Sequence, residues 1–528
     1  MQKLELTWIG KNDPHENIEP RILIENPEYS YGEVETETLS NGKQWNGNML
    51  IHGDNLLALK SLESDYSGCV KCIYIDPPYN TGNAFSLYDD MQEHSIWLNL
   101  MNIRFNSLYS LLKKDGFLFV NLDEQEHAYA KVLLDGIFGR KNFIGDIIWQ
   151  KRKGGGNDSR YLALDHDYIL VYAKDISKSV HPNKWKTRQT DEYLKRYKEE
   201  DENNRYYWDT VARNGLQSPI PVSVKCPDGT ILSIKSQMGQ ESIENGLKDG
   251  TVRLAKTKNG WTLHHKVYMK GGQVPRSIFS NSGTNKSAAD EMQYLFHDKK
   301  SFPYPKPELL IKDIIELSSS ENDIILDSFL GSGTTAAVAH KMGRKYIGVE
   351  MGNHAYTHCA KRLQMVIDGT DQGGISKEVN WQGGGGFKFY ELAPSLLKED
   401  EHGQLVINKE YNADMLAAAM AKQEGFTYAP SSEIYWKQGT SSEQDFIYTT
   451  TQFLTVETLD RIYEEMAEGE SLLICCTAFQ KECKSAHSNV SIKKIPKMLL
   501  GRCEFGKDNY NLNIISIPEV EEDNETEE

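Results

Sequence analysis

The stretch Ile73-Tyr74-Ile75-Asp76-Pro77-Pro78-Tyr79-Asn80 decides the fold, because an apolar run ends there abruptly in Asp-Pro-Pro-Tyr. Prolines have no backbone N–H to donate to a sheet, so the pattern predicts a buried strand that stops at Asp76. Open α/β sheets bind their ligands beyond the carboxyl ends of strands. We therefore expect a functional site here, with Asp76, Pro77, Pro78 and Tyr79 as its candidate catalytic residues.

These residue types suit a planar group that carries an exocyclic amine. The amine can donate to the Asp76 carboxylate and to the Pro77 carbonyl, while the Tyr79 ring stacks on the plane. Asp76 could instead cap a turn, and Tyr79 could be a core aromatic. Their position at a strand end favours function, and the stretch predicts a nucleobase site.

Length and composition predict a multi-domain protein that acts in the cytoplasm. The chain has 528 residues, enough for two to four domains, and a mean hydropathy of -0.56. No apolar run approaches the roughly 18 residues of a membrane span, and the amino terminus lacks a signal-peptide pattern. The eight cysteines are scattered. The pair Cys69 and Cys72 has no second pair at zinc-ligand spacing, so we expect buried thiols and no metal.

Alternating helices and strands predict the fold class: an α/β, doubly wound, Rossmann-like and mostly parallel sheet. The expected strands are residues 49–52, 73–75, 117–121, 144–150, 167–173, 323–327 and 345–350. The expected helices are residues 56–62, 96–112, 128–138, 306–317 and 335–340, with a last one ending near 367.

The pattern divides the chain into five parts. Residues 1–48 form an N-terminal arm, residues 49–174 the first half of the α/β domain, and residues 301–380 the second half. Residues 175–300 are irregular and strand-rich, which predicts an inserted module. A glycine run at 383–386 marks a linker, so residues 381–528 are expected to be a C-terminal α+β domain with a disordered acidic tail.

A second constellation predicts a nucleoside cofactor. Strand 323–327 is followed by Gly331-Ser332-Gly333-Thr334, a helix, and a strand that ends in Glu350. The glycines let a ligand approach the backbone, and an acid about 20 residues later can accept ribose hydroxyls. Glu350 could also be a solvated strand end. The string also fits a dinucleotide fingerprint, whereas no Walker loop is present, so we expect no ATP hydrolysis.

The two constellations together favour methyl transfer over hydride transfer. A nucleoside cofactor beside a carboxylate–aromatic amine site suggests S-adenosyl-L-methionine and an exocyclic nitrogen as acceptor. A hydride carrier would have little use for Asp-Pro-Pro-Tyr.

Basic residues are segregated despite a formal net charge of -17. The segment 251–286 holds seven Lys and Arg and no Asp or Glu, and a second basic stretch precedes a glycine run after residue 150. Such segregation favours a nucleic-acid groove over a merely solvated face. The candidate DNA-binding residues are Lys151, Arg152, Lys153, Arg253, Lys256, Lys258, Lys266, Lys270 and Arg276.

The chain resembles the amino-methylating DNA methyltransferases of the β class. Asp-Pro-Pro-Tyr and residues 327–335 are similar to the two signature motifs of that family, and they occur in the β-class order. The pairs Gly53-Asp54, Phe302-Pro303 and Lys306-Pro307 also match, as do residues 142–153. Residues 74–82 and 381–390 are similar to the modification subunits of type III restriction–modification systems. The resemblance covers residues 49–175 and 300–390.

The resemblance implies an S-adenosyl-L-methionine-dependent methyltransferase fold with residues 175–300 as target-recognition domain. Asp76 in place of Ser favours adenine N6 over cytosine N4. On this basis Asp54 contacts the cofactor or only caps a helix, and Lys306 neutralises the methionine carboxylate or is surface charge. The implied cofactor-binding residues are Asp54, Phe302, Lys306, Asp327, Phe329, Gly331, Gly333, Thr334 and Glu350.

The expected activity is sequence-specific methylation of double-stranded DNA with base flipping. The expected partner is a restriction subunit that supplies helicase and nuclease functions, and the expected assembly is a homodimer. The alternatives are a stand-alone adenine-N6 or cytosine-N4 DNA methyltransferase, a non-catalytic DNA-reading subunit, a protein-glutamine methyltransferase and a dehydrogenase. Intact Asp76, Tyr79 and Gly331 disfavour the non-catalytic reading, and the basic insert disfavours a protein substrate.

Overall fold

Strand β6 (Val70–Ile75) carries the apolar run to Asp76 and lies in the interior of an eleven-stranded sheet. The computed structural model describes residues 6–11, 17–39, 42–79, 90–154, 161–179, 185–186, 191–212, 215, 218–258, 260–269, 272, 274–508 and 510. From one edge to the other, the strands are β1 (Leu23–Glu25), β19 (Gly386–Leu392), β5 (Asn48–His52), β18 (Lys345–Glu350), β17 (Ile324–Asp327), β6, β7 (Leu112–Leu122), β9 (His166–Ala173), β8 (Phe143–Gln150) and β16 (Ile278–Phe279), while β2 (Tyr31–Gly32) pairs with β19.

Most of these strands are parallel, which confirms the expected doubly wound α/β sheet. β6 runs parallel to both of its neighbours, β17 and β7. β9 runs antiparallel between β7 and β8, and β1 and β2 run antiparallel to β19. A short hairpin of β3 (Glu37–Thr38) and β4 (Gln44–Trp45) precedes β5.

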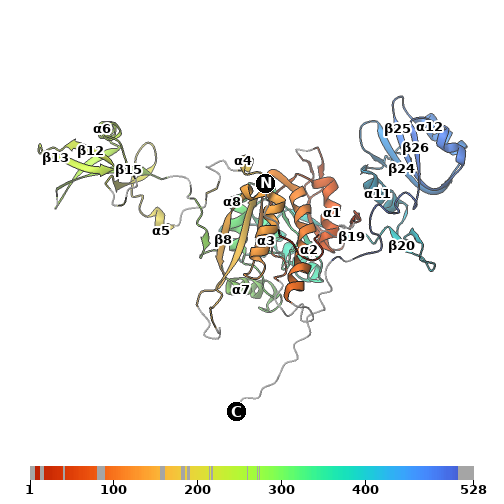
Figure 1. The fold of residues 1–528 in the computed structure, drawn as a ribbon, viewed down its shortest axis with the longest axis horizontal. Helices are drawn as coiled ribbons and strands as arrows, with labels where there is room; N and C mark the ends of the chain where they lie inside the picture. Colours follow the sequence, from red (N-terminus) through yellow and green to blue (C-terminus); the bar gives the residue numbers. More distant parts are fainter. Residues whose placement is uncertain are drawn as a thin grey trace, which may run out of the picture. The chain divides into compact units, whose positions relative to one another are not determined.

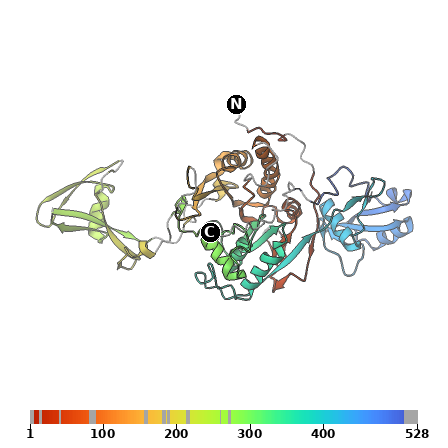
Figure 2. The same cartoon turned by 90° about the horizontal axis from the view of Figure 1, so that it is seen from below.

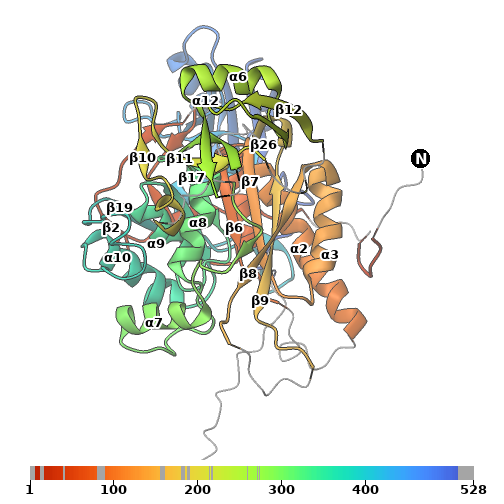
Figure 3. The ribbon, with the colours of Figure 1, turned by 90° about the vertical axis from the view of Figure 1, so that its left-hand side faces the viewer.

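Helices cover both faces of the sheet, as parallel strands require. Figures 1, 2 and 3 show the earlier helices on one face and the later helices on the other. The earlier helices are α1 (Asn55–Tyr66), α2 (Asp90–Leu111) and α3 (His127–Leu134), the last continued by a π-helical turn. The later helices are α8 (Glu308–Ser318), α9 (Thr334–Lys341) and α10 (Lys361–Ile367), the last preceded by a π-helical turn.

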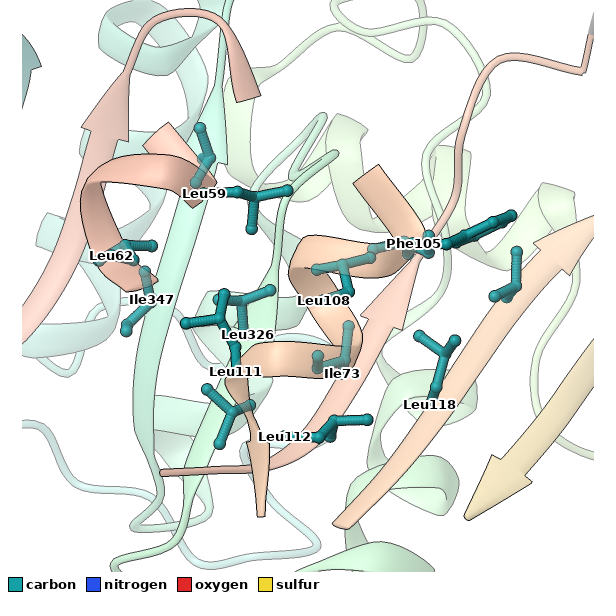
Figure 4. Packing of buried hydrophobic residues seen from close by; sticks show 14 of the residues in the cluster. Leu59, Leu62, Ile73, Phe105, Leu108, Leu111, Leu112, Leu118, Leu326 and Ile347 are labelled. Atoms are coloured by element: carbon teal, nitrogen blue, oxygen red, sulfur yellow. The ribbon is translucent and has the colours of Figure 1, made fainter. Parts of the chain in front are cut away.

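The main core lies between the sheet and helices α1 and α2 (Figure 4). Phe105, Leu108 and Leu111 recur at helical spacing on α2 and are fully buried. They pack with Ile73 of β6 and Leu326 of β17 in one cluster. Burying each large apolar side chain stabilises the fold by roughly 1.5–3 kcal/mol. This packing holds β6 and β17 rigidly where they carry the functional motifs.

A buried ionic network ties α8, α9 and α10 together on the other face. The Lys341 ammonium lies 2.8 Å from Glu308 and 2.7 Å from Asp371. The Arg362 guanidinium donates to Glu308 at 2.8 Å and to the Thr334 hydroxyl at 2.9 Å. Buried charges need such ion pairs, because an unpaired ion is costly in the interior. The network therefore anchors Thr334, the first residue of α9.

Residues 183–275 form a separate compact unit. Its four-stranded sheet has the order β10 (Glu199–Glu200), β11 (Arg205–Thr210), β15 (Gly260–Tyr268) and β14 (Val252–Thr257). A hairpin of β12 (Ile220–Lys225) and β13 (Ile231–Ser236), helix α6 (Gln240–Asp249) and the short α5 (Asp191–Leu194) complete it (Figure 1). We call this unit the insert module. Its core consists of Val211, Val222, Val224, Ile243, Val252 and Leu263.

The module is shorter than the range 175–300 expected from the sequence. Short helix α4 (Ile176–Ser179) precedes it, and residues 276–300 belong to the unit that holds the large sheet. There β16 pairs with β8, and helix α7 (Asn285–Phe296) follows. The Trp149 indole donates to the Gly283 carbonyl at 3.0 Å. The sequence did not predict that the chain rejoins the large sheet at residue 278, because β16 has only two residues and gives no periodic signal.

The expected boundary at residue 381 is also displaced. The glycine run 383–386 leads directly into β19, which pairs in parallel with β5, so residues up to 392 complete the large sheet. The C-terminal part beyond them has a second sheet of β22 (Thr427–Tyr428), β23 (Gly439–Thr440), β24 (Asp445–Leu454), β25 (Ser471–Phe479) and β26 (Val490–Lys494), a hairpin of β20 (Leu397–Glu399) and β21 (Leu405–Ile407), and helices α11 (Ala413–Glu424) and α12 (Val456–Glu465). The acidic tail lies outside the described residues.

None of the helices in the described part of the chain combines the length and the apolar character that crossing a bilayer needs. Cys69 and Cys72 are buried thiols, as expected. Burial raises the pKa of Cys72 to about 12.

The buried network predicts that Lys341→Met destabilises the large unit. The substitution leaves the Glu308 and Asp371 carboxylates without their shared cation, and breaking a buried pair costs about 3–5 kcal/mol. The free energy of unfolding in urea measures the loss. The matched control is Lys299→Met, which removes a pair with Asp290 whose side chains are 55% and 49% exposed. The control should change stability by less than about 1 kcal/mol, and an equal effect of both variants would contradict the role of the network.

Candidate functional site

The two motifs meet where the sheet changes its winding direction. After β6 the chain moves through β7 toward β8, whereas after β17 it moves through β18 in the opposite direction. This reversal of strand order leaves a crevice at the carboxyl ends of β6 and β17. A pocket of about 640 Å³ opens there, within the usual size range of small-molecule sites. Asp76, Phe329, Gly331 and Glu350 all line it.

Donors from three different segments hold the Asp76 carboxylate. The Tyr79 hydroxyl donates to Oδ1 at 2.6 Å, and the Asn121 amide donates to the same oxygen at 3.1 Å. The Lys306 ammonium forms an ion pair with Oδ2. Asp76 keeps 22% of its side chain exposed, toward the pocket. The carboxylate is thus fixed in orientation and still open to a ligand.

The Pro-Pro turn and Tyr79 are equally constrained. The Trp97 indole of α2 donates to the Pro78 carbonyl at 2.8 Å. Burial and the neighbouring Asp76 raise the pKa of Tyr79 well above its usual value, so its hydroxyl stays protonated as a donor. Lys306 lies 5.5 Å from the centre of the Tyr79 ring. Asp76, Pro77, Pro78 and Tyr79 form one wall of the pocket, and Asn80 lies outside the described residues.

The glycine turn after β17 forms the opposite wall. Gly331 has φ +58°, and a Cβ there would lie 3.4 Å from the Phe302 ring. The Gly331 N–H donates to Glu350 Oε2 at 2.7 Å, which joins the turn to the end of β18. Glu350 also accepts from the Gly352 N–H at 2.9 Å and lies 2.8 Å from His354. Gly333, with φ +83°, immediately precedes α9.

Asp327 and Thr334 support this turn from behind. Asp327 Oδ1 accepts from the Phe329 N–H at 2.9 Å, and Oδ2 accepts from the Thr335 hydroxyl at 2.6 Å. Burial raises the pKa of Asp327 to about 7, and the nearby Asp76 and Glu350 carboxylates act in the same direction. The Thr334 hydroxyl donates to the Lys306 carbonyl at 3.0 Å. Asp327, Thr334 and Lys306 all border a recess of about 30 Å³ beside the main pocket.

Asp54 stands apart from the other expected cofactor residues. Its Oδ1 accepts from the Leu56 and Leu57 N–H groups, so it caps α1. Its Oδ2 accepts from the Tyr510 N–H and lies 3.7 Å from Arg104. Asp54 does not line the pocket, whereas its neighbour Asn55 does. The capping alternative therefore describes the geometry of Asp54.

Sequence reasoning missed three polar residues of the site. Asn121 and Asp123 lie at the end of β7, and Asp167 lies near the start of antiparallel β9. Asp123 and Asp167 line the pocket, and the Asn121 amide contacts both Asp76 and the Tyr79 hydroxyl. Burial raises the pKa of Asp123 to about 6. The strand-end rule applied to Asp76 would have identified Asn121 and Asp123. The same rule would not have identified Asp167, because β9 runs antiparallel to β7 and Asp167 lies near its start rather than its end.

The expected DNA-binding residues fall into two sets. Lys151 and Arg152 line the pocket, where Lys151 pairs with Asp167 at 2.6 Å, and Lys153 is exposed beside them. Arg276 is exposed and belongs to the large unit rather than to the insert module.

The second set lies in the insert module, and its members do not share one face. In the strand register, Arg253 of β14 lies opposite His264 of β15, and Lys266 of β15 lies opposite Trp208 of β11. His264 and Lys266 are two residues apart on β15, so Arg253 and Lys266 lie on the same side of the sheet. The Arg253 guanidinium lies 4.1 Å from the Trp208 ring centre, and Lys266 pairs with Asp201 at 2.7 Å.

The remaining cations of the module lie elsewhere. Lys256 is three residues after Arg253 on β14 and points to the other side of the sheet. Lys258 is exposed in the turn that follows, and Lys270 lies outside the described residues.

The pocket fits S-adenosyl-L-methionine by shape and by donor set. Gly331 leaves room for a ligand beside the Phe302 ring, and Glu350 offers carboxylate oxygens at the end of β18. Lys306 offers an ammonium beside Asp76 on the pocket wall. Adenosine, ribose and a charged amino-acid group each have a matching partner in this set. In the described part of the chain, no group of three His, Cys, Asp or Glu residues could hold a metal ion.

Residues 70–361, more than half of the chain, match a protein family described as DNA methylase. A Haemophilus influenzae protein named "Probable type III restriction-modification enzyme HindVI Mod subunit" is 34% identical over 405 residues, which cover 66% of this chain and 54% of that protein. The "Type III restriction-modification enzyme StyLTI Mod subunit" of Salmonella typhimurium is 31% identical over 351 residues, covering 58% and 51%. The Escherichia coli "Type III restriction-modification enzyme EcoP15I Mod subunit" is 25% identical over 508 residues, covering 79% and 75%. The chain thus spans about half the length of the first two relatives.

The raised pKa of Asp327 predicts a pH-dependent contribution to stability. The unfolded carboxyl ionises near pH 4, whereas the folded one keeps its proton until about pH 7. Between these values the folded state binds one proton more, so the contribution is complete below about pH 4 and is lost as pH rises through 7. Asp327→Asn should flatten this decline in unfolding free energy relative to the wild type. Parallel stability–pH curves for the two proteins would show that Asp327 ionises normally.

Proposed function

Since the chain belongs to the DNA methylase family, we propose that it transfers a methyl group from S-adenosyl-L-methionine to adenine N6 in double-stranded DNA at a specific sequence. One observation carries the proposal: the stretch Asp76-Pro77-Pro78-Tyr79 lines the same pocket as Gly331 and Glu350. The first wall suits a base with an exocyclic amine, and the second suits a nucleoside. The pocket therefore brings an amine and a methyl donor within reach of each other.

The proposed role of the first wall is to activate a poor nucleophile. The N6 lone pair of adenine is delocalised into the ring. Hydrogen bonds from the amine to Asp76 and to the Pro77 carbonyl favour a tetrahedral nitrogen with an exposed lone pair. The bound cofactor supplies an electrophilic methyl group on sulfur. As the nitrogen–carbon bond forms and the sulfur–carbon bond breaks, Asp76 is placed to accept the proton that the amine sheds.

Positioning and electrostatics supply the catalysis in this proposal. The Tyr79 hydroxyl and the Asn121 amide hold Asp76 in one orientation before a substrate binds. Tyr79 presents its ring as a stacking platform for a base turned out of the duplex, since the target nitrogen is inaccessible inside a helix. No covalent enzyme intermediate is needed.

The proposed biological setting is a type III restriction–modification system, with this chain as modification and specificity subunit. The similarity to three Mod subunits supports this setting. Because the proposed substrate is DNA, we expect the protein to act in the cytoplasm, with a restriction subunit as partner. The alternative is a stand-alone adenine-N6 or cytosine-N4 methyltransferase. Purification with and without the neighbouring genes separates the two, and light scattering of the purified chain tests the expected homodimer.

The decisive experiment expresses the chain alone in a host free of DNA methylation and sequences the DNA by a single-molecule method. N6-methyladenine at one short motif supports the proposal, and methylation of one strand only supports the type III setting. N4-methylcytosine would favour the alternative base. DNA that stays unmodified even when the neighbouring genes are present would contradict a DNA methyltransferase.

Asp76→Ala should abolish methylation while DNA binding stays within about twofold. Removing a group that acts on the reacting nitrogen costs on the order of 100-fold or more in rate. A radioactive methyl-transfer assay measures the rate, and a gel-shift assay measures DNA affinity. Asp115→Ala is the matched control, because Asp115 pairs with Lys71 near the start of β7, at the far end of the sheet. Methylation by Asp76→Ala at the control rate would move the active site elsewhere.

Arg253→Ala should weaken DNA binding at all sequences and lower the salt dependence by about one counterion. Arg253 is exposed, and its guanidinium stacks on Trp208 on the outer side of the module sheet. The control is Lys248→Ala on α6, which packs against the inner side of that sheet. Affinity measured at several salt concentrations distinguishes the two variants. Equal slopes for wild type and Arg253→Ala would exclude this face as the DNA contact.

A further inference from the structure

The ion pair between Lys306 and Asp76 occupies an atom that the proposed reaction needs. Asp76 Oδ1 already accepts from the Tyr79 hydroxyl and from the Asn121 amide. Oδ2 accepts from the Lys306 ammonium. Both oxygens are therefore engaged by the protein itself. An adenine amine that donates to this carboxylate meets an acceptor whose charge Lys306 already neutralises, and the neutralised carboxylate is a weaker acceptor than a free one.

Of the three donors, Lys306 is the one that can move without disturbing the site. Tyr79 and Asn121 contact each other as well as Asp76, so each holds the other in place. Lys306 reaches Asp76 through a flexible four-carbon stem. Its backbone is fixed independently, because its carbonyl accepts from the Thr334 hydroxyl at 3.0 Å. The ammonium can thus swing while the chain that carries it stays bound to α9.

The surroundings of Lys306 give its ammonium a second place to go. Lys306 borders the main pocket and also the recess beside the glycine turn, next to Gly331, Ser332 and Thr334. The amino-acid group of the proposed cofactor has to lie between the Glu350 end and Asp76. Its carboxylate would arrive where the first turn of α9 presents N–H groups, which favours negative charge. Lys306 can reach that carboxylate or Asp76, but a full pairing with one weakens the other.

We propose that Lys306 is a positioning residue that couples cofactor binding to the amine site. In the ion pair described above, its ammonium neutralises Asp76. The carboxylate of the cofactor's amino-acid group draws the ammonium away and frees Oδ2 for the adenine amine. Cofactor binding therefore precedes productive base binding, and a flipped base meets an active carboxylate only when a methyl donor is present. This inference rests on the proposed function of the pocket.

Binding of two nucleosides without DNA tests the coupling. S-adenosylhomocysteine and 5′-methylthioadenosine are both neutral at sulfur, and only the first has the amino-acid group. Isothermal calorimetry gives their affinities for wild type, Asp76→Asn, Lys306→Met and the double variant. Asp76→Asn removes the competitor for Lys306, so it should tighten S-adenosylhomocysteine by at least about fivefold, the lower range of allosteric coupling. Its affinity for 5′-methylthioadenosine should not change, which also shows that the variant is folded.

The double variant excludes a simpler cause. Asp76→Asn could tighten binding merely by removing repulsion between two carboxylates, and that gain would persist without Lys306. The coupling instead predicts that the gain disappears in the Lys306→Met background. Asp115→Asn is the matched control, because Asp115 forms a lysine pair outside the pocket, with Lys71, and should leave S-adenosylhomocysteine binding unchanged.

Each outcome decides the inference. Tighter binding of S-adenosylhomocysteine by Asp76→Asn that disappears in the Lys306→Met background supports the inference. An unchanged or weaker affinity of Asp76→Asn, or a gain that persists without Lys306, overturns it while leaving the proposed function intact. A wild-type chain that binds neither nucleoside would overturn the proposed function, and the coupling with it.

Discussion

The parallel pairing of β6 with β17 is the constraint on which the site depends. About 250 residues separate the two strands in sequence, yet Ile73 lies opposite Leu326 in the sheet. The chain continues from these two strands toward opposite edges of the sheet, which leaves a crevice at their carboxyl ends. Asp76 and the Gly331 turn therefore face one pocket. The core under α1 and α2 fixes this pairing, since Ile73 and Leu326 are buried in the same cluster.

Crowding several acids at one sheet edge requires compensation, which takes three forms here. Asp76 pairs with Lys306 and Asp167 pairs with Lys151. Glu350 accepts two backbone N–H groups, from Gly331 and Gly352. Asp327 is buried and keeps its proton to about pH 7. A site of this kind is held in its charge state by its partners. A charged ligand can therefore change that state by taking a partner away.

Strand pairing also decides where the domains begin and end. The sheet edge formed by β5 would expose unpaired N–H and C=O groups without β19, so residues 386–392 return to it after α10. Residues 278–279 pair with β8 at the other edge in the same way. These short strands have no hydrophobic period of their own. The domain boundaries placed by composition at 300 and 381 therefore missed them, although the strand-rich insert was recognised.

Local sequence patterns were enough to predict the doubly wound fold, the strand ends at Asp76 and Glu350, and the glycine turn at Gly331. These features are local, because a few consecutive residues set a strand, its stop and a positive φ. Tertiary packing was needed to show that Asn121 contacts Asp76, that Asp167 lies near the Tyr79 hydroxyl, that Asp54 caps a helix, and that Lys306 reaches Asp76. Those contacts join residues 45 to 456 positions apart in the chain, or depend on which of two bonding options a carboxylate takes. Strand order and packing fix them, and neither leaves a periodic trace in the sequence.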